Sequence, residues 1–432
     1  MGQGSSANLE NLLHPKPLKK YKYFDRRCTY RSEALEISPE EMNRIESIKP
    51  EAVSPVTIQA PEGKVKVIID TDIGTDLDDA LALLYSLRTE KLDILGLTTM
   101  YGPAKVRAVY AQRMLSAHIK CRPDYKPFPV IAGAETQIGT HRDIFIDYKE
   151  GVGLLKKEEI EELGDPQKWG KGNQYEAADF IAKTIKENPN EVTIASIGIP
   201  TNIALAILKY PEIVPLIKEI VFMGCGHPVV AGKAIISKYK SSKNEWDDKT
   251  PIEFPWGTPS LQASIQEYIE SGHIIHFTPN HNFSGDSMAT SIIFSHPELK
   301  VRIVSSFITH KCWLKGKAID YLKEVAQNLT PEERNDPTKP QSVVAINLDE
   351  WFKFRNGNGG GQCPHDPLTL HEVAYQGTDS HVVYLPGTMI IHEWAAFGTF
   401  VPHKDGKHLI GVAMNGTEEF LEHLTDVLTQ EK

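Results

Sequence analysis

The chain has 432 residues, of which 41% are hydrophobic and 24% are charged, and its 57 acidic and 47 basic side chains give a formal net charge of −10. This composition is typical of a globular protein and excludes a collagen-like or wholly disordered chain. Net acidity disfavours non-specific nucleic-acid binding, which needs a basic surface, so we expect no nucleic-acid partner. Five widely spaced cysteines without a CxxC pair indicate a reducing compartment, and we expect a cytoplasmic protein.

Residues 1–61 differ in composition from the remainder, and we predict a basic, flexible leader followed by a single domain over residues 62–432. Seven basic side chains and one acidic side chain lie between Lys16 and Arg31. Gly2 and Ser6 fit the M-G-x-x-x-[ST] pattern for N-myristoylation, and a basic patch is the usual second signal for membrane attachment. Two interpretations of the leader are therefore open, a peripheral membrane contact and a plain disordered tail.

From residue 64 onward, short β-branched runs alternate with helical patterns. Strands are predicted at residues 65–69, 191–197, 220–223 and 274–278, and helices at residues 80–87 and 202–210. This alternation predicts an α/β fold, doubly wound around a mostly parallel central sheet. Ligands of such sheets bind beyond the carboxyl ends of the strands. Two polar stretches, residues 237–250 and 330–341, are predicted to be surface insertions.

A cluster of five carboxylates follows the first predicted strand, within the segment DTDIGTDLDDA that begins at Asp70. Two carboxylates 4 Å apart repel by ~4 kcal/mol at an effective dielectric of 20, so a converging group needs a cation or shifted pKa values. Oxygen ligands alone indicate a hard cation, Ca²⁺ or Mg²⁺. Helix capping accounts for Asp76 but not for the whole cluster. An EF-hand is excluded because Thr75 and Leu81 stand where that loop needs Gly and Glu.

The segment DTDIGTDLDDALAL resembles the N-terminal signature of the nucleoside hydrolases, the inosine-uridine-preferring N-ribohydrolase family. Four further segments are similar to family elements and follow the family's order: ASIGIPTNIALAI at 195–207, VFMGCG at 221–226, TPIEF at 250–254 and CPHDPLTL at 363–370. The resemblance implies Ca²⁺-dependent hydrolysis of the N-glycosidic bond of a nucleoside, which gives free base and ribose. The implied partner is a small-molecule nucleoside, and a homo-oligomer, dimer or tetramer, is left open.

The same resemblance implies a metal site. Asp72 is expected to bind Ca²⁺ and to act as the general base that activates the attacking water. Asp79, Asp366 and the backbone carbonyl of Ile197 are the other expected ligands. Asp70 is expected to steady the loop from outside the ligand set.

Substrate contacts are implied as well. Asp78 is expected to accept hydrogen bonds from the ribose 2'- and 3'-hydroxyls, and Glu253 to bind the 5'-hydroxyl. His365, directly before Asp366, is the candidate general acid for the departing base, because an imidazole can supply a proton near neutral pH.

Three departures from the family pattern concern the sugar site. The loop between Gly74 and Asp78 is two residues longer than the family's shorter form. Pro103 follows Gly102 where the family has Asn, and Pro255 stands where the AEFN element ends in Asn. Proline has no side-chain donor or acceptor, so substitute contacts are expected from Asn280, His281 or Asn282, and Asn282 is assigned to substrate binding.

Three hypotheses follow from these departures. The first is a hydrolase of ordinary ribonucleosides with substitute sugar contacts. The second is a hydrolase of a modified nucleoside or related glycosyl compound, which the insertions and the Gly-rich segment 356–361 would recognise. The third is a catalytically inactive binding protein of the same fold. Retention of the metal carboxylates and of His365 favours the first two.

Overall fold

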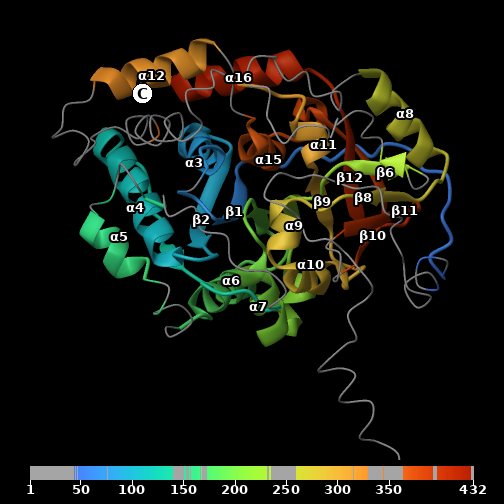
Figure 1. The fold of residues 1–432 in the computed structure, drawn as a ribbon, viewed down its shortest axis with the longest axis horizontal. Helices are drawn as coiled ribbons and strands as arrows, with labels where there is room; N and C mark the ends of the chain where they lie inside the picture. Colours follow the sequence, from blue (N-terminus) through green and yellow to red (C-terminus); the bar gives the residue numbers. More distant parts are fainter. Residues whose placement is uncertain are drawn as a thin grey trace, which may run out of the picture.

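The computed structural model describes residues 43, 45, 47–74, 76–139, 150–151, 155, 157–165, 167, 173–230, 233–234, 259–314, 316–328, 344, 363–392 and 397–429. Within these residues, twelve strands form one sheet in the order β3-β2-β1-β4-β5-β9-β12-β10-β11-β8-β6-β7, with helices on both faces (Figure 1). Six of the pairings between neighbouring strands are parallel and five are antiparallel. The predicted α/β fold with a mostly parallel sheet is confirmed.

The parallel part of the sheet comes mostly from the first half of the domain. It consists of β1 (Val65–Thr71), β2 (Leu92–Thr99), β3 (Val130–Ala132), β4 (Thr193–Ser196), β5 (Glu219–Met223) and β9 (Val301–Val304). Helices cover both faces, so these strands read as nearly continuous β-branched and apolar runs. The chain passes from β1 to β2 on one side, and β4 later pairs on the other side of β1. The strand order therefore reverses at β1, where the carboxyl ends of β1 and β4 border a ligand-binding crevice in sheets of this type.

The helices form two layers. The described helices are α3 (Asp78–Arg88), α4 (Ala104–Cys121), α5 (Lys157–Leu163), α6 (Glu176–Glu187), α7 (Thr201–Lys209), α8 (Pro259–Glu270), α9 (His281–Gly285), α10 (Ser287–Phe294), α11 (Ser306–Thr309), α12 (Lys317–Asn328), α15 (His365–Ala374) and α16 (Thr417–Thr429), with 3-10 turns η2 (Pro211–Leu216) and η4 (Gly377–Asp379). In Figure 1, α3, α15, α16 and α12 lie above the sheet and α6, α7 and α10 lie below it. Among the described helices, none combines the length and apolar character needed to cross a membrane.

The antiparallel part of the sheet was not predicted by the sequence pattern. It contains β10 (Val382–His392), β11 (Phe397–Pro402), β12 (His408–Met414), β8 (Ile275–Phe277), β6 (Pro228–Val230) and β7 (Lys233–Ala234). β12 pairs in parallel with β9 and antiparallel with β10, which joins the two parts. The strand predicted at 274–278 is present as β8, and both of its neighbours, β11 and β6, run antiparallel to it.

The end of the predicted leader packs against the domain. Val53 and Ile58 are buried in the main core, and Val56 forms an isolated antiparallel bridge with Tyr384. Ile45 is buried against β10 and β11. These residues therefore pack against the domain. The division into a leader over residues 1–61 and a domain over residues 62–432 stays a prediction. The two predicted insertions and the Gly-rich segment also lie outside them.

Candidate functional site

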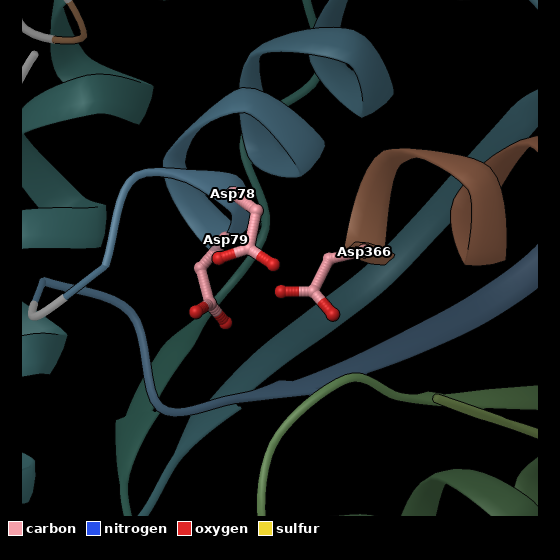
Figure 2. Close-up of side chains that lie close together, drawn as sticks. All are labelled: Asp78, Asp79 and Asp366. Carbon is pink, nitrogen blue, oxygen red and sulfur yellow. The ribbon is translucent and has the colours of Figure 1, made fainter. Parts of the chain in front are cut away.

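Three buried aspartates converge beside the strand-order reversal. Asp78 and Asp79 lie in the first turn of α3, and Asp366 lies in the first turn of α15. Their carboxylates point toward one another (Figure 2), and one oxygen of each lies within 4.8 Å of the others. α3 packs against α15, so the two helix N-termini meet at this point. The partial positive charge of a helix N-terminus favours carboxylates there.

The three carboxylates carry more negative charge than their protein neighbours offset. Burial raises the pKa of Asp78 and of Asp366 well above the ordinary value, and nearby carboxylates raise it further. Burial and the charge of Asp72 raise the pKa of Asp79, although the Thr71 hydroxyl donates a hydrogen bond to its Oδ1 atom. A buried donor set made only of carboxylate oxygens fits a hard divalent cation such as Ca²⁺, which offsets this charge.

Asp72 lies beside these three aspartates and is paired with a histidine. Its Oδ2 atom is 3.4 Å from Nε2 of His281, the first residue of α9. Burial opposes ionisation, but the hydrogen bond and charge of His281, with the charge of Arg107, hold the pKa of Asp72 below its ordinary value. The structure thus groups Asp78, rather than Asp72, with Asp79 and Asp366. The charge of Asp72 nevertheless raises the pKa of Asp366, so Asp72 belongs to the same electrostatic cluster.

A buried arginine that no sequence motif indicates holds the acidic loop. Arg107 lies on α4 and donates from Nη1 to the backbone oxygens of Asp72 and Ile73. Its Nε atom donates to the backbone oxygen of Tyr101 over 3.0 Å. Tyr101 follows β2 at a φ of 68°, and its ring contacts His281 edge-on. Arg107 therefore ties together the loops that follow β1 and β2.

Asp70 lies at the end of β1 and joins neighbouring strands. Its Oδ1 atom accepts hydrogen bonds from the Thr98 hydroxyl and from Nδ2 of Asn202. Burial raises the pKa of Asp70 to about 7, although both hydrogen bonds act against the shift. Its backbone oxygen accepts from the amide of Ile197. Asn202 lies in the segment 195–207, and its side chain bridges Asp70 and the backbone oxygen of Thr99.

Asn282 brings α9 to the same region. Its Nδ2 atom donates to the backbone oxygens of Ile197 and Met223, each over 2.9 Å. Asn280 caps α9, since its side chain accepts from the amide of Phe283. The backbone carbonyl of Ile197 is predicted to bind the metal, and Asn282 is predicted to bind the substrate. In the structure these two groups are hydrogen-bonded to each other.

Two other predictions concern sugar contacts. Glu253, expected to bind the 5'-hydroxyl, and Pro255 both lie outside the described residues. Pro103 is described, and it is the N-cap residue of α4.

His365 is the first residue of α15 and sits among other histidines. Its Nδ1 atom contacts the Thr309 hydroxyl, and the His310 ring packs edge-on against it at 5.1 Å. Nδ1 of His310 in turn lies 3.1 Å from Nε2 of His227. Burial, with His310 and His227, holds the pKa of His365 well below its ordinary value. This direction differs from the imidazole that titrates near neutral pH expected from the sequence. The role of His365 as general acid stays a prediction.

Comparison with known proteins identifies relatives along most of the chain. The profile of the family described as inosine-uridine preferring nucleoside hydrolase matches residues 67–413. The pyrimidine-specific ribonucleoside hydrolase RihA of Salmonella paratyphi B is 31% identical over 308 residues, which cover 70% of this chain and 78% of that protein. Uridine nucleosidase 1 of Arabidopsis thaliana is 35% identical over 162 residues, which cover 37% of this chain and only 44% of that protein.

Solved structures share the fold. A plant nucleoside hydrolase superposes with a TM-score of 0.55 at 20% identity, covering 84% of this chain and 99% of that chain. A purine-preferring ribonucleoside hydrolase from Gardnerella vaginalis gives a TM-score of 0.55 at 19% identity, covering 84% of this chain and 98% of that chain. From the profile match and the similarity to RihA of Salmonella paratyphi B, the chain belongs to the inosine-uridine preferring nucleoside hydrolase family.

Proposed function

We propose that this protein hydrolyses the N-glycosidic bond of a ribonucleoside and releases free base and ribose, with Ca²⁺ as its metal. The observation that carries the proposal is the convergence of Asp78, Asp79 and Asp366 beyond the carboxyl end of β1, in a member of this family. The names of two relatives, a uridine nucleosidase and a pyrimidine-specific ribonucleoside hydrolase, favour uridine and cytidine as the first substrates to test.

The metal would be held by carboxylates from two helices and one loop. We assign Asp79, Asp366, Asp72 and the carbonyl of Ile197 as its protein ligands. Asp78 is assigned to the ribose hydroxyls, and its place beside Asp79 and Asp366 puts it within reach of whatever those two bind. When bound, a divalent ion lowers the pKa of a water molecule and orients the hydroxyls of the sugar.

Asp72 is suited to take a proton from the attacking water. His281 and Arg107 keep its carboxylate ionised, which is the form that accepts a proton. Arg107 also fixes the backbone of Asp72 and Ile73, so the carboxylate is presented from a rigid loop. Fixed geometry of this kind lowers the entropy cost of bringing the reacting groups together.

His365 is the group that we assign to the leaving base. It precedes Asp366 in the first turn of α15, so the base contact and the metal ligand are carried by one rigid element. A donor placed against the base stabilises the negative charge that develops as the glycosidic bond breaks.

Asn282 favours ordinary ribonucleosides over a modified substrate. The family's asparagine after Gly102 is replaced by Pro103, which offers no side-chain hydrogen bond. Asn282 lies at Ile197 and Met223, so an asparagine amide stands beside the expected metal ligands despite that loss. We therefore assign Asn282 to the sugar. A modified nucleoside or related glycosyl substrate remains the second candidate because of Pro103.

The test is release of free base by the full chain. Uridine, cytidine, inosine and adenosine are incubated with the protein, with and without a calcium chelator, and the free base is separated by chromatography. We expect chelator-sensitive release that is abolished in Asp72→Ala and Asp366→Ala. Asp124→Ala, which changes an exposed aspartate in a surface pair with Arg122, is the control and is expected to behave as wild type. Full activity of Asp366→Ala would overturn the assignment.

A further inference from the structure

We propose that Thr309 is a positioning residue for His365, one that fixes the orientation of the ring and the nitrogen that carries its hydrogen. In this arrangement Nδ1 accepts from the Thr309 hydroxyl, and Nε2 carries the hydrogen and donates it in a hydrogen bond to the leaving base. The inference rests on the proposed function, because it gives a geometry to the residue assigned to the base.

Thr309 lies between β9 of the sheet and α15. It is the last residue of α11, the short helix that follows β9, and its side chain is fully buried. Its hydroxyl oxygen lies 2.5 Å from Nδ1 of His365. Its backbone oxygen accepts a hydrogen bond from the thiol of Cys363 over 3.1 Å. Both contacts join Thr309 to the segment that leads into α15, so the turn at 306–309 sets where His365 lies.

We assign the hydroxyl hydrogen to the ring. A threonine hydroxyl has one hydrogen, and two acceptors are near it: Nδ1 of His365 at 2.5 Å and the backbone oxygen of Ser306 at 3.3 Å. In the proposed arrangement the shorter contact takes the hydrogen. The Cys363 thiol donates to the backbone oxygen of Thr309 and lies 3.7 Å from Nδ1. With Nδ1 as the acceptor, a neutral ring carries its hydrogen on Nε2. The reverse arrangement, in which Nδ1–H donates to the Thr309 oxygen and the hydroxyl donates to Ser306, is the one that a protonated Nδ1 would reveal.

A second contact limits rotation of the ring. The His310 ring meets the His365 ring at a centroid distance of 5.1 Å and an angle of 77°. The hydrogen bond between His310 and His227 holds the His310 ring in turn. The ring of His365 is thus bounded by His310 and anchored at Nδ1 by Thr309, which leaves the Nε2 edge as its donor.

Loss of the hydroxyl should affect the chemical step more than substrate binding. In Thr309→Val the anchor at Nδ1 is gone while the shape of the side chain is kept, so the ring samples other orientations and the other tautomer. A misplacement of about 1 Å in a reacting group costs about 100-fold in rate. We expect kcat to fall by about 10- to 100-fold and KM to change by less than about twofold. Thr309→Ser keeps a hydroxyl and should recover most of the wild-type kcat.

The chain offers a matched control. Thr369 is also buried, and its hydroxyl donates over 3.0 Å to the backbone oxygen of His365 rather than to its ring. Thr369→Val makes the same chemical change near the same residue, and its kcat should stay within about twofold of wild type. Ca²⁺-induced thermal stabilisation, measured in every variant, shows whether the acidic site is still formed.

A measurement without turnover tests the tautomer directly. Protein labelled with ¹⁵N in histidine gives separate nitrogen signals for protonated and unprotonated ring nitrogens, and the signals missing from His365→Gln belong to His365. We expect a protonated Nε2 and an unprotonated Nδ1 in wild type and in Thr309→Ser, and a mixture in Thr309→Val. A protonated Nδ1 in wild type, or identical kcat in Thr309→Val and wild type, would overturn the inference. Absence of base release by wild type would instead count against the proposed function.

Discussion

The Nδ2 atom of Asn282 lies 2.9 Å from the backbone oxygen of Ile197, so the start of α9 is joined to the end of β4. The second hydrogen of the same amide goes to the backbone oxygen of Met223 at the end of β5. β4 is the neighbour of β1, which the acidic loop follows, and β5 is the next strand of the sheet. The amide therefore supports a carbonyl that we assign to the metal, and it holds two parallel strands at a fixed separation where the site is built.

Asn282→Leu removes the donor of both carbonyls. Each buried oxygen left without a hydrogen bond costs about 1–3 kcal/mol, so we expect the free energy of unfolding to fall by about 2 kcal/mol or more. We also expect base release to drop about tenfold or more, because two hydrogen bonds are lost and 1.4 kcal/mol of lost transition-state stabilisation corresponds to a factor of ten. Urea denaturation and base release measure the two effects. Wild-type turnover in this variant would refute the assignment of Asn282.

Asp366→Asn distinguishes a functional acidic site from a structural one. In chelator, loss of one of three crowded carboxylates should raise the free energy of unfolding by about 1 kcal/mol, because repulsion and the burial of charge are reduced. With Ca²⁺ at 100 times its Kd, wild type should gain about 2.7 kcal/mol, whereas the variant should gain little. Thermal melts with and without Ca²⁺ check both. A variant less stable than wild type in chelator would indicate a structural role.

Arg107→Ala should disturb the loop that carries Asp72. Three backbone oxygens lose their donor, and the buried Glu150 carboxylate loses an ion-pair partner at 3.7 Å. Removal of a buried charged partner costs about 3–5 kcal/mol. We expect a loss of stability in that range together with weaker Ca²⁺ binding, measured by denaturation and calorimetry. Arg113→Ala is the control on the same helix, because its pair with Glu159 is half-exposed and is expected to contribute about 1 kcal/mol.

A buried ion pair under α15 predicts the acid sensitivity of the fold. Arg302 forms two hydrogen bonds with Glu219 and donates to the backbone oxygen of Glu372 in α15. Burial opposes ionisation of Glu219, but Arg302 and Lys300 outweigh it and lower its pKa to about 2. The folded pKa lies below the unfolded one, so this stabilisation is complete above about pH 4.5 and is lost as the pH falls toward 2.

Glu219→Gln tests that linkage. A shift of this size contributes about 3 kcal/mol. The difference in unfolding free energy between wild type and variant should be large at pH 7 and should shrink by pH 3. Urea denaturation at both values measures it. A difference independent of pH would show that the charge of Glu219 does not stabilise the fold.

The sequence predicted the helices and strands that a local pattern of apolar residues specifies. β1 and α3 appear where the apolar β-branched run and the helical apolar run predict them, with β1 extending two residues further to Thr71. The antiparallel part was missed because strand direction depends on which strands pair, and pairing of β8 with β11 joins residues more than 100 positions apart. No local pattern carries that information.

The residues of the site also fall into two groups, those that the sequence predicted and those that only the structure shows. Asp78, Asp79 and Asp366 were identified from a dense motif and from a resemblance, and the structure brings them together. Arg107, Thr309 and Asn202 act through hydrogen bonds to groups distant in sequence, and each is a single polar residue in an ordinary helix or turn. Such residues become recognisable only when the fold shows which atoms they face.

The rate of uracil release from uridine by the full chain, in chelator and after Ca²⁺ is restored, decides whether the acidic site is a metal-dependent catalytic site. We expect release to stop in chelator and to return with Ca²⁺, and we expect Asp366→Ala to stay inactive under both conditions. Equal release with and without chelator would contradict a metal-dependent site at Asp78, Asp79 and Asp366. Absence of release from uridine, cytidine, inosine and adenosine in saturating Ca²⁺ would contradict ribonucleoside hydrolysis itself.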